Sequence, residues 1–288
     1  MSSLFVLLPS GPVTGATEFD YLVSPDGRSV GAHASAPATL LPPAQGAGAE
    51  VVAVVPAAAL SWHRVELPKG VSPGSPRLRA VLEGLLEDHL LDEPEALHFA
   101  LEPQARPGAP VWVAVCQRDW LRSALQVLEA AGRAGGRVVP EVAPETPGGL
   151  DAVGEPGQAL LAVSGPDGVS VLPLSSGSLA LLPAVPDEAL CFAEPALAAQ
   201  AEPLLQRPVV LQTAPQRWLQ AAQSRWDLAQ FEFASSARAR RLRKLGTGSA
   251  ELLRAPQWRA ARWGAALLVL GNLVGLNAWA WKESSLLV

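Results

Sequence analysis

The stretch RLRAVLEGLLEDHLLDEPEALHFAL, from Arg77 to Leu101, changes its hydrophobic period half-way and so decides the expected architecture. Its first part places apolar residues three and four positions apart, as on one face of an amphipathic helix. We expect this helix over residues 76–91, with an apolar face made of Leu78, Val81, Leu82, Leu85, Leu86 and Leu90. Its last part, residues 98–101, is a short apolar run that predicts a strand.

Short runs rich in valine and leucine, bounded by turn residues, indicate further strands. They cover residues 4–8, 19–23, 51–55, 60–67 and 111–116. The GPDG at residues 165–168 is turn chemistry, so residues 160–164 and 169–174 are expected to form a hairpin. Other helical patterns lie at residues 118–131, 187–201 and 215–224. Strands followed by helices, once before residue 140 and again after residue 158, predict an α/β domain with two lobes.

Proline and glycine mark the expected divisions of the chain. We expect a first lobe at residues 1–142, a loop or junction at 143–157 (APETPGGLDAVGEPG) and a second lobe at 158–237. Residues 34–49 are expected to be a loop. The GAGAEV within it lacks a third glycine and precedes a strand, so it does not indicate a dinucleotide-binding turn.

An uncharged run near the end of the sequence predicts a membrane helix. Residues 263–281 comprise 19 residues without charge, which as a helix reach about 28 Å, close to the hydrocarbon thickness of a bilayer. A buried core helix is the alternative, but its apolar run is usually shorter and lacks paired aromatic ends. Tryptophans and cations stand where they would hold a span at the interfaces. The expected anchor residues are Trp258, Arg259, Arg262, Trp263, Trp279, Trp281 and Lys282.

The charge distribution predicts the orientation of this span. Residues 1–237 carry a net charge of −12, whereas residues 238–288 carry +7, mostly in the juxtamembrane segment 238–262. Since cations favour the cytoplasmic side, the N-terminal domain is expected in the cytoplasm and the tail 282–288 in the periplasm. The basic segment could contact anionic lipid. It could instead bind nucleic acid, but the acidic N-terminal part argues against that partner.

Two glycines suggest that the membrane helix has a helical partner. Gly271 and Gly275 are four residues apart, so they share a helix face on which a second backbone could approach closely. Asn272 and Asn277 favour such a partner, because their amides need hydrogen bonds in hydrocarbon. The partner could be a second copy of this chain or another single-span protein.

Signals for export and covalent cross-linking are absent from the sequence. The start, MSSLFVLLPSG, has no basic region and only a short apolar run, unlike a signal peptide. Cys116 and Cys191 stand far apart in apolar contexts, which favours core packing in a reducing compartment over a disulfide or a metal site.

Catalytic motifs are also missing. No lysine follows a glycine-rich turn, no GxSxG or HExxH occurs, and the four histidines have no metal-ligand spacing. We therefore expect no catalytic residue, cofactor or metal. One acidic run is either a solvated helix face or a surface that steers a basic partner. The candidate partner-binding residues are Glu83, Glu87, Asp88 and Asp92.

Several motifs together resemble a known family. Residues 77–101 are followed by VWVAVCQRDWLRSALQVLEAAG (111–132) and preceded by VVAVVPAAALSWHRVELP (51–68). WDLAQFEFASSARARRLRK (226–244) resembles a stretch with the pattern NLxxGEFA, although Asp227 and Phe231 replace its Asn and Gly. In this combination the sequence is similar to the inner-membrane L protein of the type II secretion system.

The resemblance implies a two-lobed cytoplasmic domain of actin-like, RNase H-related fold, a single transmembrane helix and a small periplasmic ferredoxin-like domain. It also implies a non-catalytic scaffold that docks the cytoplasmic secretion ATPase (the E protein) beside the M and F proteins of the membrane platform. Actin-like ATPases carry a DxG turn after the first strand of each lobe. The corresponding turns are expected at residues 7–12 and 162–168, and neither has an aspartate before glycine at that spacing.

Two other functions stay open on the sequence. One is an actin-like nucleotide-binding protein of pilus assembly, which the missing DxG turns disfavour. The other is a membrane-anchored enzyme of unknown type.

Overall fold

The structure, a computed structural model, describes residues 2–46, 49–134, 136–144, 148–182, 185–186 and 188–234. These residues belong to one structural unit, residues 1–239. The expected basic segment, membrane helix, anchor residues and helix-association glycines lie outside the described residues. Within the described ranges, no helix combines the length and the apolar character that a membrane span needs.

The first sheet is built around the N-terminal strand, in the order β3-β2-β1-β4-β8. Its strands are β1 (Ser3–Leu7), β2 (Glu18–Ser24), β3 (Ala32–Pro37), β4 (Glu50–Val55) and β8 (Arg137–Pro140). β1 pairs antiparallel with β2 and parallel with β4, which pairs parallel with β8. Successive side chains of a strand point to opposite faces, so Leu4 and Val6 belong to one core cluster and Phe5 to another.

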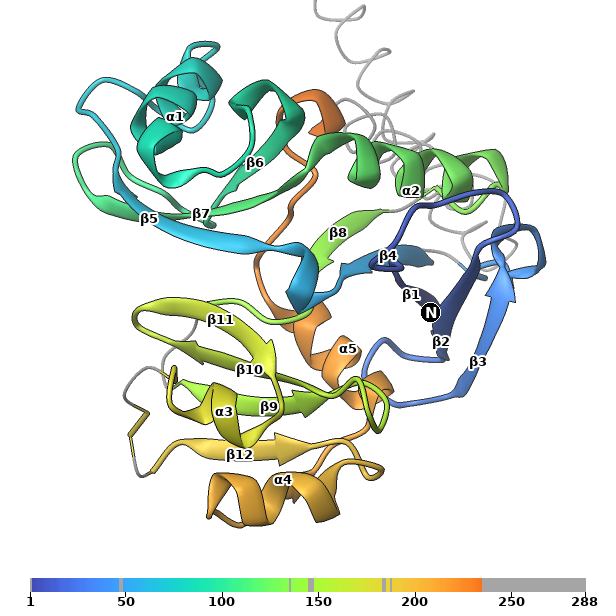
Figure 1. The fold of residues 1–288 in the computed structure, drawn as a ribbon. Coiled ribbons are helices and arrows are strands. Elements are labelled where there is room, and N and C mark those ends of the chain that lie inside the picture. Colours follow the sequence, from blue (N-terminus) through green and yellow to red (C-terminus); the bar gives the residue numbers. More distant parts are fainter. Residues whose placement is uncertain are drawn as a thin grey trace, which may run out of the picture. The chain divides into compact units, whose positions relative to one another are not determined.

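Each face of the first sheet is covered by one helix (Figure 1). α2 (Arg118–Ala130) buries Leu121, Ala124 and Leu128 in the cluster that contains Leu4. α5 (Ala214–Gln223) buries Trp218 and Leu219 in the cluster that contains Phe5. Its first turn is closed by Thr213, whose N–H donates to Gln216 Oε1 at 2.8 Å. Both helices were expected from the sequence, within one residue at each end.

A second, three-stranded antiparallel sheet is inserted between β4 and α2. It consists of β5 (Ser61–Glu66), β7 (Pro110–Gln117) and β6 (Leu97–Leu101), in that order. α1 (Leu78–Leu86) packs on this sheet through Leu78, Leu82 and Leu86. The helix expected over 76–91 is shorter than predicted, because residues 87–89 form a separate 3-10 turn. Leu85, expected on the apolar face, is 37% exposed.

The third sheet forms the second lobe, in the order β11-β10-β9-β12-β13. Its strands are β9 (Gly149–Val153), β10 (Leu160–Gly165), β11 (Gly168–Pro173), β12 (Leu190–Ala193) and β13 (Val210–Leu211). The predicted hairpin is confirmed, since β10 and β11 pair through Gly165 and Gly168. α3 (Ser176–Leu179) and α4 (Ala198–Leu205) complete this lobe, and α4 buries Ala201 in the core of the third sheet.

Three parts of the sequence-based prediction are wrong. β3 extends into the expected loop 34–49, β9 lies within the expected junction 143–157, and β12 lies in the expected helix 187–201. In β9, Leu150 and Ala152 face the core while Asp151 faces the opposite way, an alternation hidden by the surrounding Pro and Gly. β12 shows the same alternation, with Cys191 and Ala193 buried. Tertiary pairing therefore overrides the local composition.

The last described segment, residues 226–234, returns to the three-stranded sheet and is called the C-terminal strap. Gln230 pairs with Leu101 through both ends of its amide: Oε1 accepts from the Leu101 N–H at 3.1 Å and Nε2 donates to its carbonyl at 2.8 Å. Leu228 donates its N–H to the Val138 carbonyl of β8 at 2.7 Å. The strap thus joins the first and second sheets.

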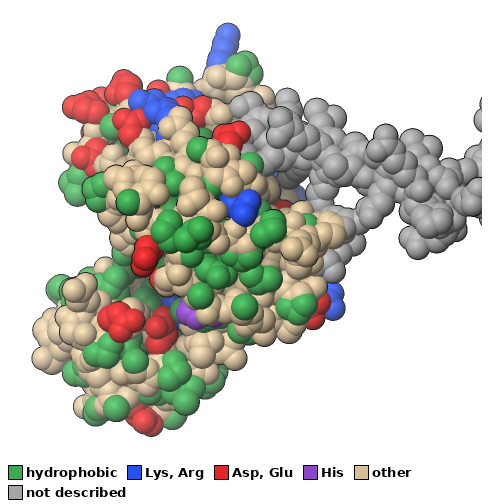
Figure 2. Space-filling model, turned by 90° about the vertical axis from the view of Figure 1, so that its right-hand side faces the viewer, with side chains coloured by type: hydrophobic (Ala, Val, Ile, Leu, Met, Phe, Trp, Pro, Cys, Tyr) green, Lys and Arg blue, Asp and Glu red, His purple; other side chains and the backbone are tan. Residues whose placement is uncertain are grey.

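The elements form two lobes with a mixed α/β fold. The first and second sheets make one lobe and the third sheet makes the other, with α5 lying between them in Figure 1. The space-filling view in Figure 2 shows the surface indented between these two parts. The expected mixed α/β fold is therefore present in the described residues, although α5 and the C-terminal strap, expected in the second lobe at 158–237, pack with the first sheet.

Candidate functional site

The acidic residues predicted to bind a partner lie along the end of α1 and the loop that leads to β6. Glu83 pairs with Arg79 at 2.7 Å one turn away on α1. Glu87 and Asp88 lie on the 3-10 turn Glu87–His89 and are exposed, and Asp92 accepts a hydrogen bond from Gln117 Nε2 at 2.8 Å. We call the four carboxylates, Glu83, Glu87, Asp88 and Asp92, the acidic surface.

α1 lies in the upper part of the molecule in Figure 1, and acidic side chains gather in the upper part of the face that Figure 2 shows. Among the described residues, Glu87, Asp88 and Asp92 make no ion pair. Their charge is therefore available to attract a basic partner. Whether they bind one stays a prediction.

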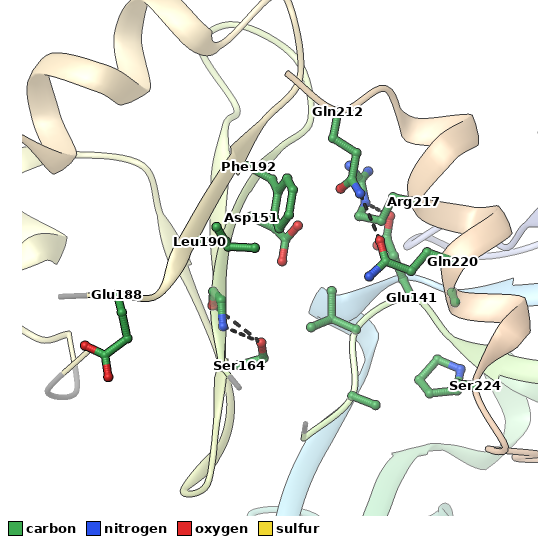
Figure 3. Close-up of a pocket in the computed structure, with 16 residues that line it drawn as sticks. Glu141, Asp151, Ser164, Glu188, Leu190, Phe192, Gln212, Arg217, Gln220 and Ser224 are labelled. Carbon is green, nitrogen blue, oxygen red and sulfur yellow. Dashed lines mark hydrogen bonds and ion pairs between the residues drawn. The ribbon is translucent and has the colours of Figure 1, made fainter. Parts of the chain in front are cut away.

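A second candidate site is a cavity of about 290 Å³ between the lobes, which sequence reasoning did not find (Figure 3). It lies where α5 and the end of β8 meet one face of the third sheet. Its polar lining includes Glu141, Asp151, Ser164, Gln212, Arg217 and Gln220.

One arginine dominates this cavity. Arg217 projects from α5, lies next to the core residue Trp218 and is itself buried, although it is charged. Its Nε lies 2.9 Å from Glu141 Oε1 and its Nη2 lies 2.6 Å from Glu194 Oε1. The other Glu141 oxygen, Oε2, accepts the Ala57 N–H at 3.1 Å. The guanidinium charge is therefore already satisfied by two carboxylates.

Asp151 adds a third carboxylate. It lies on β9 opposite Phe192 of β12, on the sheet face that lines the cavity. Figure 3 shows its side chain directed into the space between the sheet and α5. Burial raises the pKa of Asp151 to about 6; Arg217 lowers it and the Glu141 charge raises it. Near pH 7 the cavity thus holds more negative than positive charge.

Two turns would hold phosphate in an actin-like ATPase, and the structure places one of them elsewhere than the sequence predicted. The first strand of the second lobe is β9, so its turn is residues 154–158, GEPGQ, rather than 162–168, which is the β10–β11 hairpin. After β1 the chain reads LPSGP at residues 8–12. Neither turn contains an aspartate.

A second cavity, of about 630 Å³, lies at the turn after β1. Its lining includes Ser10, Gly11, Pro12, Asp119, Trp120 and Ser123, and none of its lining residues is Lys or Arg. Trp120 Nε1 donates to the Pro9 carbonyl at 2.9 Å and thereby fixes one wall. A cavity with a carboxylate and no cation is poorly suited to phosphate.

The remaining reactive side chains are buried within the fold. Cys116 and Cys191 are both buried and unpaired. Burial raises the pKa of Cys116 to about 12 and raises that of Cys191, so both thiols stay protonated. His98 is buried with Nε2 2.7 Å from the Leu228 carbonyl, and burial lowers its pKa to about 4. Among the described residues, no group of three His, Cys, Asp or Glu could hold a metal ion.

Comparison with known proteins decides the family. Residues 12–235 match the family model described as type II secretion system (T2SS), protein L. The chain belongs to this family. The T2SS protein L match spans both lobes and the C-terminal strap, and it confirms the family that the sequence motifs indicated. No curated protein matches the chain.

Solved structures show which known folds this member of the T2SS protein L family resembles. The cytoplasmic domain of EpsL, an inner membrane component of the type II secretion system of Vibrio cholerae, is 23% identical with a TM-score of 0.56. The alignment covers 81% of this chain and 100% of that domain. A PilM–PilN type IV pilus biogenesis complex is 15% identical with a TM-score of 0.42, over 75% and 89% of the two chains. The fold of the described residues thus resembles that of the EpsL domain.

Proposed function

We propose that this T2SS protein L is a non-catalytic scaffold at the bacterial inner membrane whose two-lobed part lies in the cytoplasm and docks the secretion ATPase. The observation that carries the proposal is the family match over residues 12–235. The expected span at 263–281 would fix the domain to the membrane, and the basic segment 238–262 would contact anionic lipid.

Docking beside the membrane would act through local concentration. A partner held by a membrane-fixed domain meets its neighbours as if the contacts were intramolecular, which raises their effective concentration. The ATPase (the E protein) would bind in the cytoplasm, and the M and F proteins would be the membrane neighbours. The acidic surface is the proposed contact with the ATPase, because Glu87, Asp88 and Asp92 are exposed and make no ion pair with a described residue, and such charges increase the rate of association with a basic surface.

The chemistry of the turns supports a scaffold over an actin-like ATPase. Phosphoryl transfer relies on a carboxylate-held metal and on cations that stabilise the transferred group. Neither turn, 8–12 or 154–158, carries an aspartate. In the cavity between the lobes, Arg217 is already paired with Glu141 and Glu194, so it is not free to bind phosphate.

The contact between the lobes supports the same proposal. Actin-like enzymes bind nucleotide between lobes that must admit it. Here, one guanidinium binds Glu141 at the end of β8 and Glu194 after β12, so it fastens the first sheet to the third. Opening the cavity would expose or separate buried charges, at a cost of several kcal/mol. A fixed arrangement of the lobes suits a docking platform.

The test uses the full chain in lipid nanodiscs. We expect saturable binding of the purified secretion ATPase by biolayer interferometry. We also expect no saturable heat on titration with millimolar Mg-ATP. Absence of ATPase binding would overturn the docking proposal. Clear Mg-ATP binding would favour the alternative, an actin-like nucleotide-binding protein of pilus assembly.

A further inference from the structure

An exposed leucine stands beside the acidic surface. Leu91 lies in the loop between the 3-10 turn Glu87–His89 and the turn Pro94–Ala96, and its exposure is 104% of the reference value. Complete exposure leaves unused the stabilisation that burial of a leucine side chain contributes. Its sequence neighbours are acidic: Asp88, Asp92 and Glu93.

A single exposed leucine is common on protein surfaces, so its surroundings decide whether it matters. The loop that carries Leu91 is fastened on both sides. Before it, Leu90 packs against the core cluster of the three-stranded sheet. After it, Asp92 accepts the hydrogen bond from Gln117 at 2.8 Å. The loop is therefore held with Leu91 directed outward.

Arg79 fixes the far end of the same loop. Its Nη2 donates to the Leu97 carbonyl at 3.1 Å and to the Pro94 carbonyl at 3.4 Å. The guanidinium also lies over the ring of Phe99, 5.5 Å from its centroid. An apolar side chain on a backbone that is already held costs little backbone entropy when a partner covers it, which favours its use as an interface anchor.

We propose that Leu91 is the apolar anchor of the acidic surface and inserts into an apolar pocket, rimmed by Lys and Arg, on the secretion ATPase. This inference rests on the proposed docking function and names the contact that holds the complex. Charge complementarity identifies the rim, because Glu87, Asp88 and Asp92 surround the loop without an ion pair among the described residues. Interfaces commonly combine a desolvated apolar centre with a polar rim.

The two parts of the surface should affect different rates. Rim charges act over a distance and change the association rate and its salt dependence. A buried anchor acts only in the formed complex and changes the dissociation rate. Leu91→Ala should therefore raise the dissociation rate, whereas Glu87→Lys with Asp88→Lys should slow association and reduce its dependence on salt.

The experiment measures ATPase binding to the full chain in nanodiscs by biolayer interferometry at two salt concentrations. Leu91→Ala is expected to weaken binding about tenfold or more, mainly through faster dissociation. Leu40→Ala is the matched control, since Leu40 is also a leucine with high exposure, 72%, in the same lobe. The control should bind like the unmodified chain, and both variants should keep its melting temperature.

Each outcome separates the two proposals. If the unmodified chain does not bind the ATPase, the docking function itself is wrong. If the unmodified chain binds and Leu91→Ala binds equally well, docking stands and the Leu91 anchor is wrong. Equal weakening by Leu91→Ala and Leu40→Ala would also reject the anchor, because the effect would not be specific to this loop.

Discussion

Arg217 Nη2 lies 2.6 Å from Glu194 Oε1, and this ion pair connects α5, the helix on the first sheet, with the residue that directly follows β12 of the third sheet. The same guanidinium reaches Glu141 through Nε, at 2.9 Å. Burial acts to lower the pKa of Arg217, but the two carboxylates raise it above its usual value. Removing one member of such a buried cluster costs more than forming the cluster contributes, because an unpaired charge remains.

Arg217→Met should therefore lower the free energy of unfolding by about 3–5 kcal/mol. The measurement is urea unfolding of residues 1–239, the structural unit that contains every described core residue. Arg217→Met combined with Glu141→Gln and Glu194→Gln is the matched control, and it should recover part of the loss since neither glutamate is left as an unpaired buried charge. An equal loss in both would show that packing, and not charge, is responsible.

Asp151→Asn should stabilise the domain near neutral pH. The folded-state pKa of about 6 lies above the usual 3.8, so the folded state holds the proton more tightly. This contribution is full below about pH 4 and is lost as the pH rises through 6. Asparagine should thus raise the free energy of unfolding by about 3 kcal/mol at pH 7.5, with no gain from this source at pH 4. Urea titrations across this range would detect the difference; a gain that is the same at both pH values contradicts it.

His98 should act in the opposite direction over nearly the same range. Its folded-state pKa of about 4 lies below the usual 6.5, so its contribution is present above 6.5 and lost as the pH falls toward 4. His98→Gln should show a loss of stability between pH 6.5 and 4 that is smaller by about 3 kcal/mol than in the unmodified chain. The amide can still donate to the Leu228 carbonyl, so the comparison isolates the charge. Parallel pH profiles would contradict the prediction.

The two groups should nearly cancel in the unmodified protein. Between pH 4 and 6, stability falls with rising pH through Asp151 and increases through His98. Each single variant should therefore show a steeper pH dependence than the unmodified chain, in opposite directions. The double variant should again have a shallow profile.

The orientation in the membrane can be tested with reporters fused after residue 240. The net charge of +7 in residues 238–288 is concentrated before the expected span, which places the fusion point in the cytoplasm. A fluorescent protein that matures in the cytoplasm should be active there, and an export-dependent phosphatase should be inactive. The reverse pattern would contradict both the orientation and the proposed docking of a cytoplasmic ATPase.

Elements with a strong local period were predictable. α2 and α5 follow helical patterns that begin within one residue of the expected positions, and the β10–β11 hairpin is specified by the turn residues between its strands. In these elements the apolar spacing and the local turn chemistry agree with the tertiary structure. The exposure of Glu87, Asp88 and Asp92 agrees with the predicted solvated run, whereas their role in binding a partner stays a prediction.

The cavity between the lobes was not predictable for the opposite reason. Glu141, Glu194 and Arg217 are far apart in the sequence, and their pairing depends on how three elements meet. Only weak signals existed: Arg217 precedes Trp218 and Leu219 in a helix whose buried face includes all three, and Asp151 interrupts a short apolar run. β9 and β12 were missed because they are short and their flanks are rich in Pro, Gly and Ala.

The C-terminal strap has a mechanical consequence. Gln230 makes two hydrogen bonds to the backbone of Leu101, and His98 hydrogen-bonds to the Leu228 carbonyl. The Leu228 N–H donates to the Val138 carbonyl in β8. Tension applied to the chain beyond residue 234 would load all of these bonds together and spread the force over two sheets. Up to that residue the domain would transmit a pull directly, without a hinge that absorbs it. The strap would therefore transmit a displacement of the chain that follows it to β6, the strand that follows the loop after α1.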